Sequence, residues 1–357
     1  MAFDPETPRF YPLRHPGEVM ILRERRRAEL AAMPDTLVER LCGPDRRSGW
    51  PSHGTVRNVS GEGQPAQGLA LTLMRAAAAV LAWDSDVARR LIVSHLVRYA
   101  SKDALSRLRG EIDAKTFYNL DRTLLPVIVS YSFVRDHPDL ESQDRERIDE
   151  WLERLVRFRG PDRAVDPGRV SSRNNHRYLR DSVTMAMGAL VGEDGMFREG
   201  IRRYHLALEQ LRDDGSLPLE TDRGRLALFY QRHAAASLVA IAEMAAVQGY
   251  DLYAAINARG LGLHDLIGFL ARGIDDPANL ESYTSEPQSL EFLALRGHGR
   301  HYMAWLEAYA ARFPDHDNVR RLRAAISRFG ETDPLRLDDY SGGMTSCMFG
   351  SGKSTNN

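Results

Sequence analysis

Apolar side chains recur with a helical period along most of the chain from about residue 68 onward. Phe197, Ile201, Tyr204, Leu208 and Leu211 follow one another at steps of four and three residues. Such steps place side chains on one face of an α-helix, and the segment 148–155 repeats the pattern. No segment shows a convincing alternation of apolar and polar residues of the kind expected for a half-buried strand.

The same periodicity predicts a series of helices of similar length, separated by short turns rich in Gly, Pro and Asp. They fall near 18–33, 68–83, 85–101, 117–136, 226–248, 263–272, 287–296, 299–313 and 317–328. With the segments above, the chain holds about a dozen helices. At 357 residues it could form two or three compact domains or one large repetitive architecture. Paired antiparallel helices with short breaks favour a single all-α domain, an (α/α) toroid spanning 1–357.

Two segments interrupt this pattern. The stretch 43–67 is long, polar and glycine-rich, which is typical of a functional loop, and we interpret it as a lid carrying Trp50, His53 and Arg57. The end of the chain, 350–357, contains GSGKST. It lacks the spacing of a phosphate-binding loop, because Cys347 stands where that motif requires glycine. We expect a flexible tail there.

Composition narrows the function classes. Hydrophobic residues make up 43% of the chain and charged residues 27%, and no apolar run is long enough to span a membrane. The formal net charge of -1 gives no indication of nucleic-acid binding. All but three of the 48 cationic side chains are arginine, which is suited to planar recognition of carboxylates. We therefore expect neither a membrane nor a nucleic acid as partner.

Cysteines and the first residues bear on cofactors and location. Cys42 and Cys347 form neither a zinc spacing nor a redox pair, and we expect no metal and no cofactor. A long-range disulfide between them stays open, since sequence separation carries no geometric information. The first residues hold no apolar signal core, so the expected location is cytoplasmic; the alternative is periplasmic or secreted, if the numbering omits a signal.

The segment RNNHRYLR, 173–180, gathers amide, imidazole, phenol and guanidinium groups. Asn174 or Asn175 is a good N-cap for a helix that follows, and His176 would then be a partly buried imidazole. A helix N-terminus also offers unpaired N–H groups and a positive dipole, so an amide there can help to hold a carboxylate. Capping and ligand binding are compatible.

The segment 213–230, DDGSLPLETDRGRLALFY, contains a turn followed by a helix. If that helix has begun by Arg223, then Arg223 and Tyr230 lie two turns apart on one face, about 10 Å along the axis. Both side chains could then contact one elongated ligand. The alternative is that Tyr230 belongs to the core and Arg223 to the surface.

Together these segments resemble polysaccharide lyase family 5, the alginate (polymannuronate) lyases. The resemblance covers about 115–350. It rests on Asn-Asn-His at 174–176, Asp-Gly-Ser-Leu-Pro-Leu-Glu at 214–220, an arginine cluster at 223–225 and Ala-Leu-Phe-Tyr at 227–230. It implies a catalytic set of Asn175, His176, Arg223 and Tyr230.

The chain also departs from the family pattern. The sugar-stacking tryptophan of the family is Leu179 here, the histidine after the catalytic tyrosine is Gln231, and the lid tyrosine has no evident counterpart. These differences bear on the preference for mannuronate more than on the type of reaction.

The resemblance implies β-elimination on a polyuronate, either alginate or a related polyglucuronate-type polymer. Asn175 and Arg223 would neutralise the sugar carboxylate next to the proton that is removed. Tyr230 and His176 would serve as base and acid, without a metal. The partner would be an acidic polysaccharide, and the protein a monomer or weak oligomer.

A long acidic polymer needs further contacts along its length. Candidate substrate-binding residues are Tyr178, Arg122, Tyr118 and Arg336.

Two other functions remain open. A glycoside hydrolase on the same scaffold would need two facing carboxylic acids, for which Asp181 and Glu220 are the nearest candidates. The arginines around them would lower carboxyl pKa values, which disfavours a general acid. A non-catalytic polysaccharide-binding protein would explain Leu179 and the missing lid tyrosine.

Overall fold

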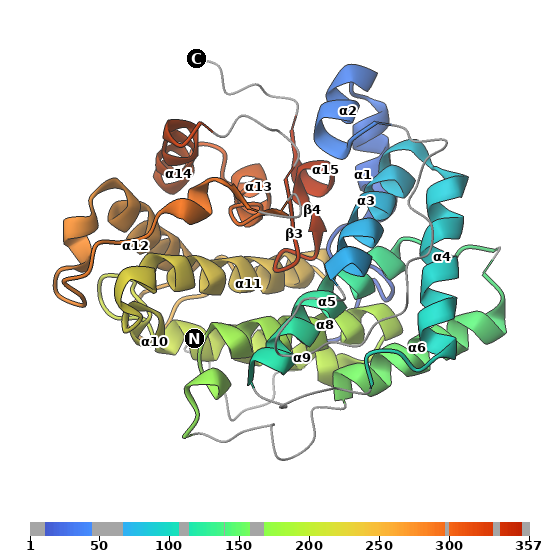
Figure 1. Ribbon diagram of the computed structural model, residues 1–357, viewed down its shortest axis with the longest axis horizontal. Coiled ribbons are helices and arrows are strands. Elements are labelled where there is room, and N and C mark those ends of the chain that lie inside the picture. Colours follow the sequence, from blue (N-terminus) through green and yellow to red (C-terminus); the bar gives the residue numbers. More distant parts are fainter. Residues whose placement is uncertain are drawn as a thin grey trace.

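The computed structural model describes residues 11–44, 67–106, 114–138, 140–157, 168–296, 300–330 and 336–351. Helices account for most of them (Figure 1). The α-helices are α1 (Arg23–Ala31), α2 (Asp35–Cys42), α3 (Gln67–Trp83), α4 (Asp86–Ser101), α5 (Ala114–Ser132), α6 (Ser142–Arg157), α8 (Asn175–Val191), α9 (Asp194–Glu209), α10 (Pro218–Thr221), α11 (Ala227–Val247), α12 (Leu263–Asp275), α13 (Trp305–Arg312), α14 (Asp317–Arg328) and α15 (Thr345–Phe349). Short 3-10 turns are η1 (Val170–Ser172), η2 (Gly224–Leu226), η3 (Pro277–Leu280) and η4 (Glu291–Leu293).

The helices form two layers wound into a ring. In the inner layer α3 packs on α5, α5 on α8, α8 on α11, α11 on α13, and α13 on α15, which returns to α3. The outer layer consists of α4, α6, α9, α12 and α14, each packed against one or two inner helices. Figure 1 shows α11 crossing the centre of the molecule, with α8 and α9 beneath it, α12 beside it, and α14 above α12 and next to α13. The predicted all-α toroid is confirmed.

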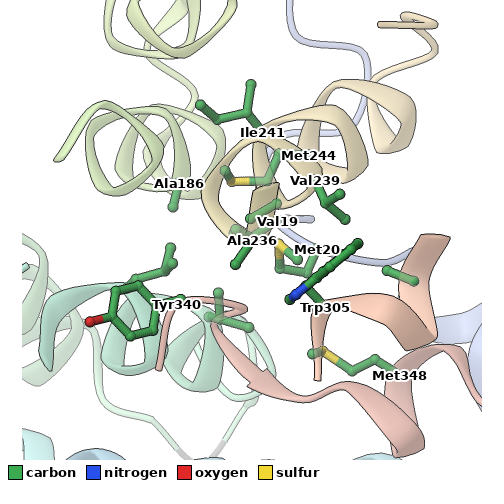
Figure 2. Close-up of a cluster of buried hydrophobic side chains, with 14 of the residues drawn as sticks. Val19, Met20, Ala186, Ala236, Val239, Ile241, Met244, Trp305, Tyr340 and Met348 are labelled. Atoms are coloured by element: carbon green, nitrogen blue, oxygen red, sulfur yellow. The ribbon is translucent and has the colours of Figure 1, made fainter. Parts of the chain in front are cut away.

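The pattern of buried side chains distinguishes the inner helices from the outer ones. Nearly every side chain of α11 is buried, which is typical of a helix that is covered on all sides. In contrast α6 is amphipathic, and its buried residues are those of the predicted apolar face, including Trp151 and Leu155. Figure 2 shows part of the core, where Val19 and Met20 of the N-terminal segment gather with Trp305 of α13.

A disulfide joins the two ends of the described chain. Cys42, the last residue of α2, is bonded to Cys347 in α15, at a sequence separation of 305 residues. Arg26 of α1 reinforces this connection by donating from Nε to the Cys347 carbonyl at 2.9 Å and from Nη2 to the Gly350 carbonyl at 2.7 Å. The disulfide between Cys42 and Cys347, which the sequence left open, is therefore present in the structure.

Several predicted elements differ in the structure. The helix expected at 287–296 is wrong: that segment contains η4 and then strand β1 (Leu295–Arg296), which pairs antiparallel with β2 (Arg300–His301). A second pair, β3 (Leu337–Asp338) with β4 (Gly343–Met344), was also missed. Strands of two residues are too short for an alternating pattern to appear in the sequence.

The predicted lid at 43–67 lies mostly outside the described residues, including Trp50, His53 and Arg57, and so does the tail from 352. Within the described part of the chain, we find no helix whose length and apolar character would allow it to span a membrane.

Candidate active site

The first turns of three inner helices come together at one place. Tyr118 lies near the start of α5, His176 is the second residue of α8, and Tyr230 is the fourth residue of α11. The Tyr118 ring stacks on the His176 imidazole, with centroids 4.1 Å apart and planes 19° apart. Both tyrosine rings also contact His233, at centroid distances of 6.4 Å for Tyr118 and 5.7 Å for Tyr230. We call these four side chains the ring cluster.

The start of α8 fixes the His176 side of the ring cluster. Asn174 is the N-cap, since its backbone is extended and its Oδ1 accepts a hydrogen bond of 3.1 Å from the His176 N–H. The capping role predicted for Asn174 or Asn175 is thus confirmed for Asn174. Asn175 is then the first helical residue and His176 the second, so both lie at the positive end of the helix dipole.

Asn175 is bound on two sides by Glu220 of α10. Its backbone N–H donates to Oε1 and its Nδ2 donates to Oε2, each at 2.7 Å. Glu220 is 0% exposed and Asn175 only 1% exposed. Burial raises the pKa of Glu220 to about 7, although the hydrogen bonds from Asn175 and the charge of Arg223 act in the opposite direction. Arg223 therefore lowers this pKa, as expected of a nearby arginine, but burial outweighs it, and the expected net lowering is wrong.

These contacts give no support to the hydrolase alternative. Both oxygens of Glu220 accept hydrogen bonds from Asn175, and the carboxyl group is buried, so it is not placed to protonate a glycosidic oxygen. Asp181 is also buried, and its Oδ2 accepts from Nε of Arg177 and of Arg203, at 2.8 Å each. Each carboxylate is already held by structural partners.

Arg223 lies in contact with Tyr230 and does not share its helix. The chain passes from Arg223 through the 3-10 turn η2, and α11 begins only at Ala227. Gly224 makes this turn with φ +53, and a Cβ there would lie 2.2 Å from Glu286 Oε1. The Arg223 guanidinium carbon is 4.6 Å from the centroid of the Tyr230 ring. The predicted spacing of two helical turns is wrong, and the two groups are closer than it implied.

The hydroxyl of Tyr118 is hydrogen-bonded by two other side chains. Its hydroxyl lies 2.7 Å from Nδ1 of His233 and hydrogen-bonds the hydroxyl of Tyr340. Burial raises the pKa of Tyr118 well above its usual value, and the nearby Tyr340 adds to this. Burial also lowers the pKa of His233 well below its usual value, assisted by the charges of Arg232 and Arg122. Both groups are therefore neutral near pH 7.

The sequence analysis missed His233 and Tyr340. His233 lies three residues after Tyr230, on the same face of α11, so helical spacing could have found it. Tyr340 stands in the turn between β3 and β4, far along the chain, and its hydroxyl points away from the apolar cluster in Figure 2. No local pattern marks that position.

A buried ion-pair group anchors the turn that carries Tyr340. Oδ2 of Asp339 accepts from Arg122 Nη2 at 2.7 Å and from Arg300 Nη1 at 2.8 Å. All three side chains are buried. Arg122, predicted to bind substrate, is thus committed to Asp339, and we correct its role to one of supporting the turn.

The remaining predicted substrate contacts have different surroundings. Tyr178 is 1% exposed, its hydroxyl lies 3.5 Å from Gln210 Oε1, and burial raises its pKa, so it is a core residue and the prediction of sugar contact is wrong. Tyr118 is half-buried within the ring cluster. Arg336 is half-buried, and its Nη1 lies 2.7 Å from Nδ1 of His301. Substrate contact by Tyr118 and Arg336 stays a prediction.

Two departures from the family pattern lie in the core. Leu179 is 0% exposed, so this position of α8 faces packed side chains. Gln231 is also buried, accepting from the Leu217 N–H at 3.2 Å and donating to the Gly215 carbonyl at 3.2 Å. Gln231 therefore fixes the turn that leads into α10.

Comparisons with known proteins agree with this fold. A family model described as alginate lyase matches residues 97–280. A polysaccharide lyase of Stenotrophomonas maltophilia (strain K279a) is 33% identical over 187 residues, which are 52% of this chain and 52% of that protein. An alginate lyase of Azotobacter chroococcum mcd 1 is 29% identical over 156 residues, 44% of this chain and 40% of that protein. The chain spans about half the length of the curated relatives it matches.

Among solved structures, alginate lyase A1-III from Sphingomonas species A1 is similar with a TM-score of 0.75 and 24% sequence identity. That comparison covers 95% of this chain and 97% of the other. At this level of identity the likeness concerns the fold.

Proposed function

This chain belongs to the alginate lyase family, and from that premise we propose that it cleaves a polyuronate by β-elimination. The substrate would be alginate, with polymannuronate as the first candidate, or a related polyglucuronate-type polymer. The ring cluster and Arg223 would form the reaction site. The observation that carries the proposal is the contact of Arg223 with Tyr230 beside the stacked pair of His176 and Tyr118.

The reaction first requires neutralisation of the sugar carboxylate. Removal of the C5 proton places further negative charge next to a group that is already an anion, so fixed positive charge must stabilise it. Arg223 supplies a guanidinium group, and the first turns of α5, α8 and α11 add the positive ends of three helix dipoles. Asn175 would contribute an amide donor to the same carboxylate. The proposed chemistry requires no metal ion.

Proton transfer would be carried out by Tyr230 and His176. The C5–H bond and the C4–O4 bond break, a C4–C5 double bond forms, and O4 leaves with a proton, so no water is consumed. Where proton and leaving group lie on one face of the sugar, Tyr230 would act as base and then as acid. For the opposite C5 epimer, His176 is better suited as base and Tyr230 as acid.

The groups behind the site would keep these side chains in place. Tyr118 stacks on His176 and is itself hydrogen-bonded to His233 and Tyr340. A stacked and hydrogen-bonded neighbour restricts the imidazole to one orientation, which lowers the entropic cost of reaching the reactive geometry. The buried group at Asp339 supports this arrangement through Tyr340.

Ultraviolet absorbance of the unsaturated product tests the proposal. We expect an increase when the protein is incubated with polymannuronate or another member of a panel containing polyguluronate, polyglucuronate and hyaluronate. Tyr230→Phe should abolish the increase while the circular dichroism spectrum stays unchanged, because only a hydroxyl is lost. Tyr250→Phe is a matched control: it also removes one hydroxyl, which donates to the Pro12 carbonyl at 2.7 Å beyond the C-terminal end of α11.

The alternative outcomes are distinct. New reducing ends without the absorbance would identify a hydrolase, and binding without either product would identify a polysaccharide-binding protein. Tyr230→Phe with most of the activity retained would refute the role given to that residue.

A further inference from the structure

Both oxygens of the Glu220 carboxyl group are hydrogen-bonded by Asn175. Oε1 accepts the Asn175 backbone N–H and Oε2 accepts Nδ2, each at 2.7 Å. Both residues are almost fully buried. The remaining polar atom of the amide, Oδ1, is buried and has no hydrogen-bond partner among the described residues.

This pairing conflicts with a simple neutralising role for Asn175. Nδ2 carries two hydrogens and Glu220 Oε2 binds one of them, so the free edge of the amide presents Oδ1, which can only accept, beside the second Nδ2 hydrogen. A substrate carboxylate also accepts, so an oxygen placed against Oδ1 would be repelled. For Asn175 to present both Nδ2 hydrogens and no acceptor to the substrate, its amide must turn over, and Glu220 must then offer a donor to Oδ1.

A protonated carboxyl group provides that donor. The backbone N–H of Asn175 cannot be reversed, so Oε1 accepts in either state, and only Oε2 can carry the proton. When Oε2 is protonated it donates to Oδ1, and both Nδ2 hydrogens are released for the substrate. When Oε2 is ionised it binds Nδ2, and Oδ1 is presented instead.

We propose that Glu220 is a positioning residue whose protonation selects the side-chain atom of Asn175 that meets the uronate carboxylate. This inference rests on the proposed function, and it assigns the protonated state of Glu220 to the substrate complex. Charge acts in the same direction as geometry, because an ionised Glu220 would also repel the anionic sugar. By linkage, substrate binding and proton uptake by Glu220 favour each other.

The surroundings of Glu220 allow this change near neutral pH. Burial raises its pKa to about 7. Among the charged and titratable groups of the neighbouring elements, Arg223 and Tyr178 of α8 interact with Glu220 directly. The others are one residue further away: Arg212 donates to Thr221, Arg203 of α9 acts on Tyr178, Tyr230 of α11 lies against Arg223, and His176 follows Asn175 on α8. Of these, Arg223 favours the ionised form of Glu220 and Glu220 in turn raises the pKa of Tyr178. A substrate carboxylate that pairs with Arg223 would weaken the influence of Arg223 on Glu220 and so favour the protonated form of Glu220.

Glu220→Gln keeps the shape of the side chain but removes the group that titrates. The glutamine Oε1 can accept the Asn175 N–H, and its Nε2 can donate to Oδ1, which reproduces the hydrogen bonds of the protonated carboxyl at every pH. For the wild type, KM should rise above about pH 7 because only the protonated fraction is competent, by up to roughly thirty-fold at pH 8.5. In Glu220→Gln this rise should be absent, with kcat near the wild-type maximum. Glu281→Gln, at an exposed position, is the matched control and should follow the wild type.

The experiment measures KM and kcat for wild type, Glu220→Gln and Glu281→Gln from pH 5.5 to 8.5, using product absorbance. An equal rise of KM in wild type and Glu220→Gln would overturn the inference, as would a flat wild-type profile. If no unsaturated product forms with any polyuronate, the proposed function itself has failed, which is a different result.

Calorimetry provides a second measurement that does not depend on folding of the Gln variant. Binding of a mannuronate oligomer to Tyr230→Phe at pH 8 in two buffers of different ionisation enthalpy should reveal uptake of close to one proton. Uptake of no proton would contradict the inference.

Discussion

Removing the Cys42–Cys347 disulfide should lower the free energy of unfolding by about 3–5 kcal/mol. The bond closes a loop of 305 residues between α2 and α15. In the chain-entropy treatment, a loop of this length restricts the unfolded chain by roughly 19 cal/mol/K, or about 5–6 kcal/mol at 25 °C. Measured effects are smaller because unfolded chains are compact, which leads to the stated range.

Urea unfolding of the double variant Cys42→Ala/Cys347→Ala, followed by circular dichroism, measures this difference. The control is the wild type with and without a reductant, in which thiol titration of the unfolded protein should find free thiols only after reduction. A loss below about 1 kcal/mol, or free thiols in the unreduced protein, would refute the reasoning. Because disulfides persist mainly in oxidising compartments, a bond found in protein isolated from its cells would support a periplasmic or secreted location.

Three further predictions concern charged groups. Asp339→Ala leaves Arg122 and Arg300 buried without their shared carboxylate, so we expect a loss of about 3–5 kcal/mol in urea unfolding; stability equal to wild type would contradict this role. Burial raises the pKa of Glu220 from 4.5 to about 7, so the folded state binds the extra proton in that interval and stability should fall by roughly 3 kcal/mol as pH rises across it. Urea unfolding at several pH values should show this slope in wild type and not in Glu220→Gln. Arg223→Ala should reduce kcat/KM by roughly 10²–10³-fold in the absorbance assay, whereas its exposed neighbour Arg225 should tolerate the same change.

The sequence predicted the inner and outer helices well where amphipathic or buried patterns were long. Helix α6 was recognised from its apolar face, and the start of α8 from the capping asparagines. Short elements were not recognisable, since β1 to β4 have two residues each, and two residues cannot show the alternating pattern of a strand even though each strand pairs with a neighbour a few residues away. The predicted helix at 287–296 failed for the same reason.

The site was predictable only in part. Local motifs identified Asn175, His176 and Tyr230, but the contact between Arg223 and Tyr230 depends on a turn at Gly224 that helical periodicity does not describe. Tyr178 carries the same chemistry as Tyr118, yet one is buried and the other stacks on His176. Which side of a helix faces the site is decided by tertiary packing, and the sequence does not contain that information in local form.

The most direct test of the account is mass spectrometry of the products formed from polymannuronate in heavy-oxygen water. We predict oligouronates with an unsaturated non-reducing end and no heavy oxygen incorporated by cleavage, because elimination consumes no water. Saturated products that each carry one heavy oxygen would contradict the account.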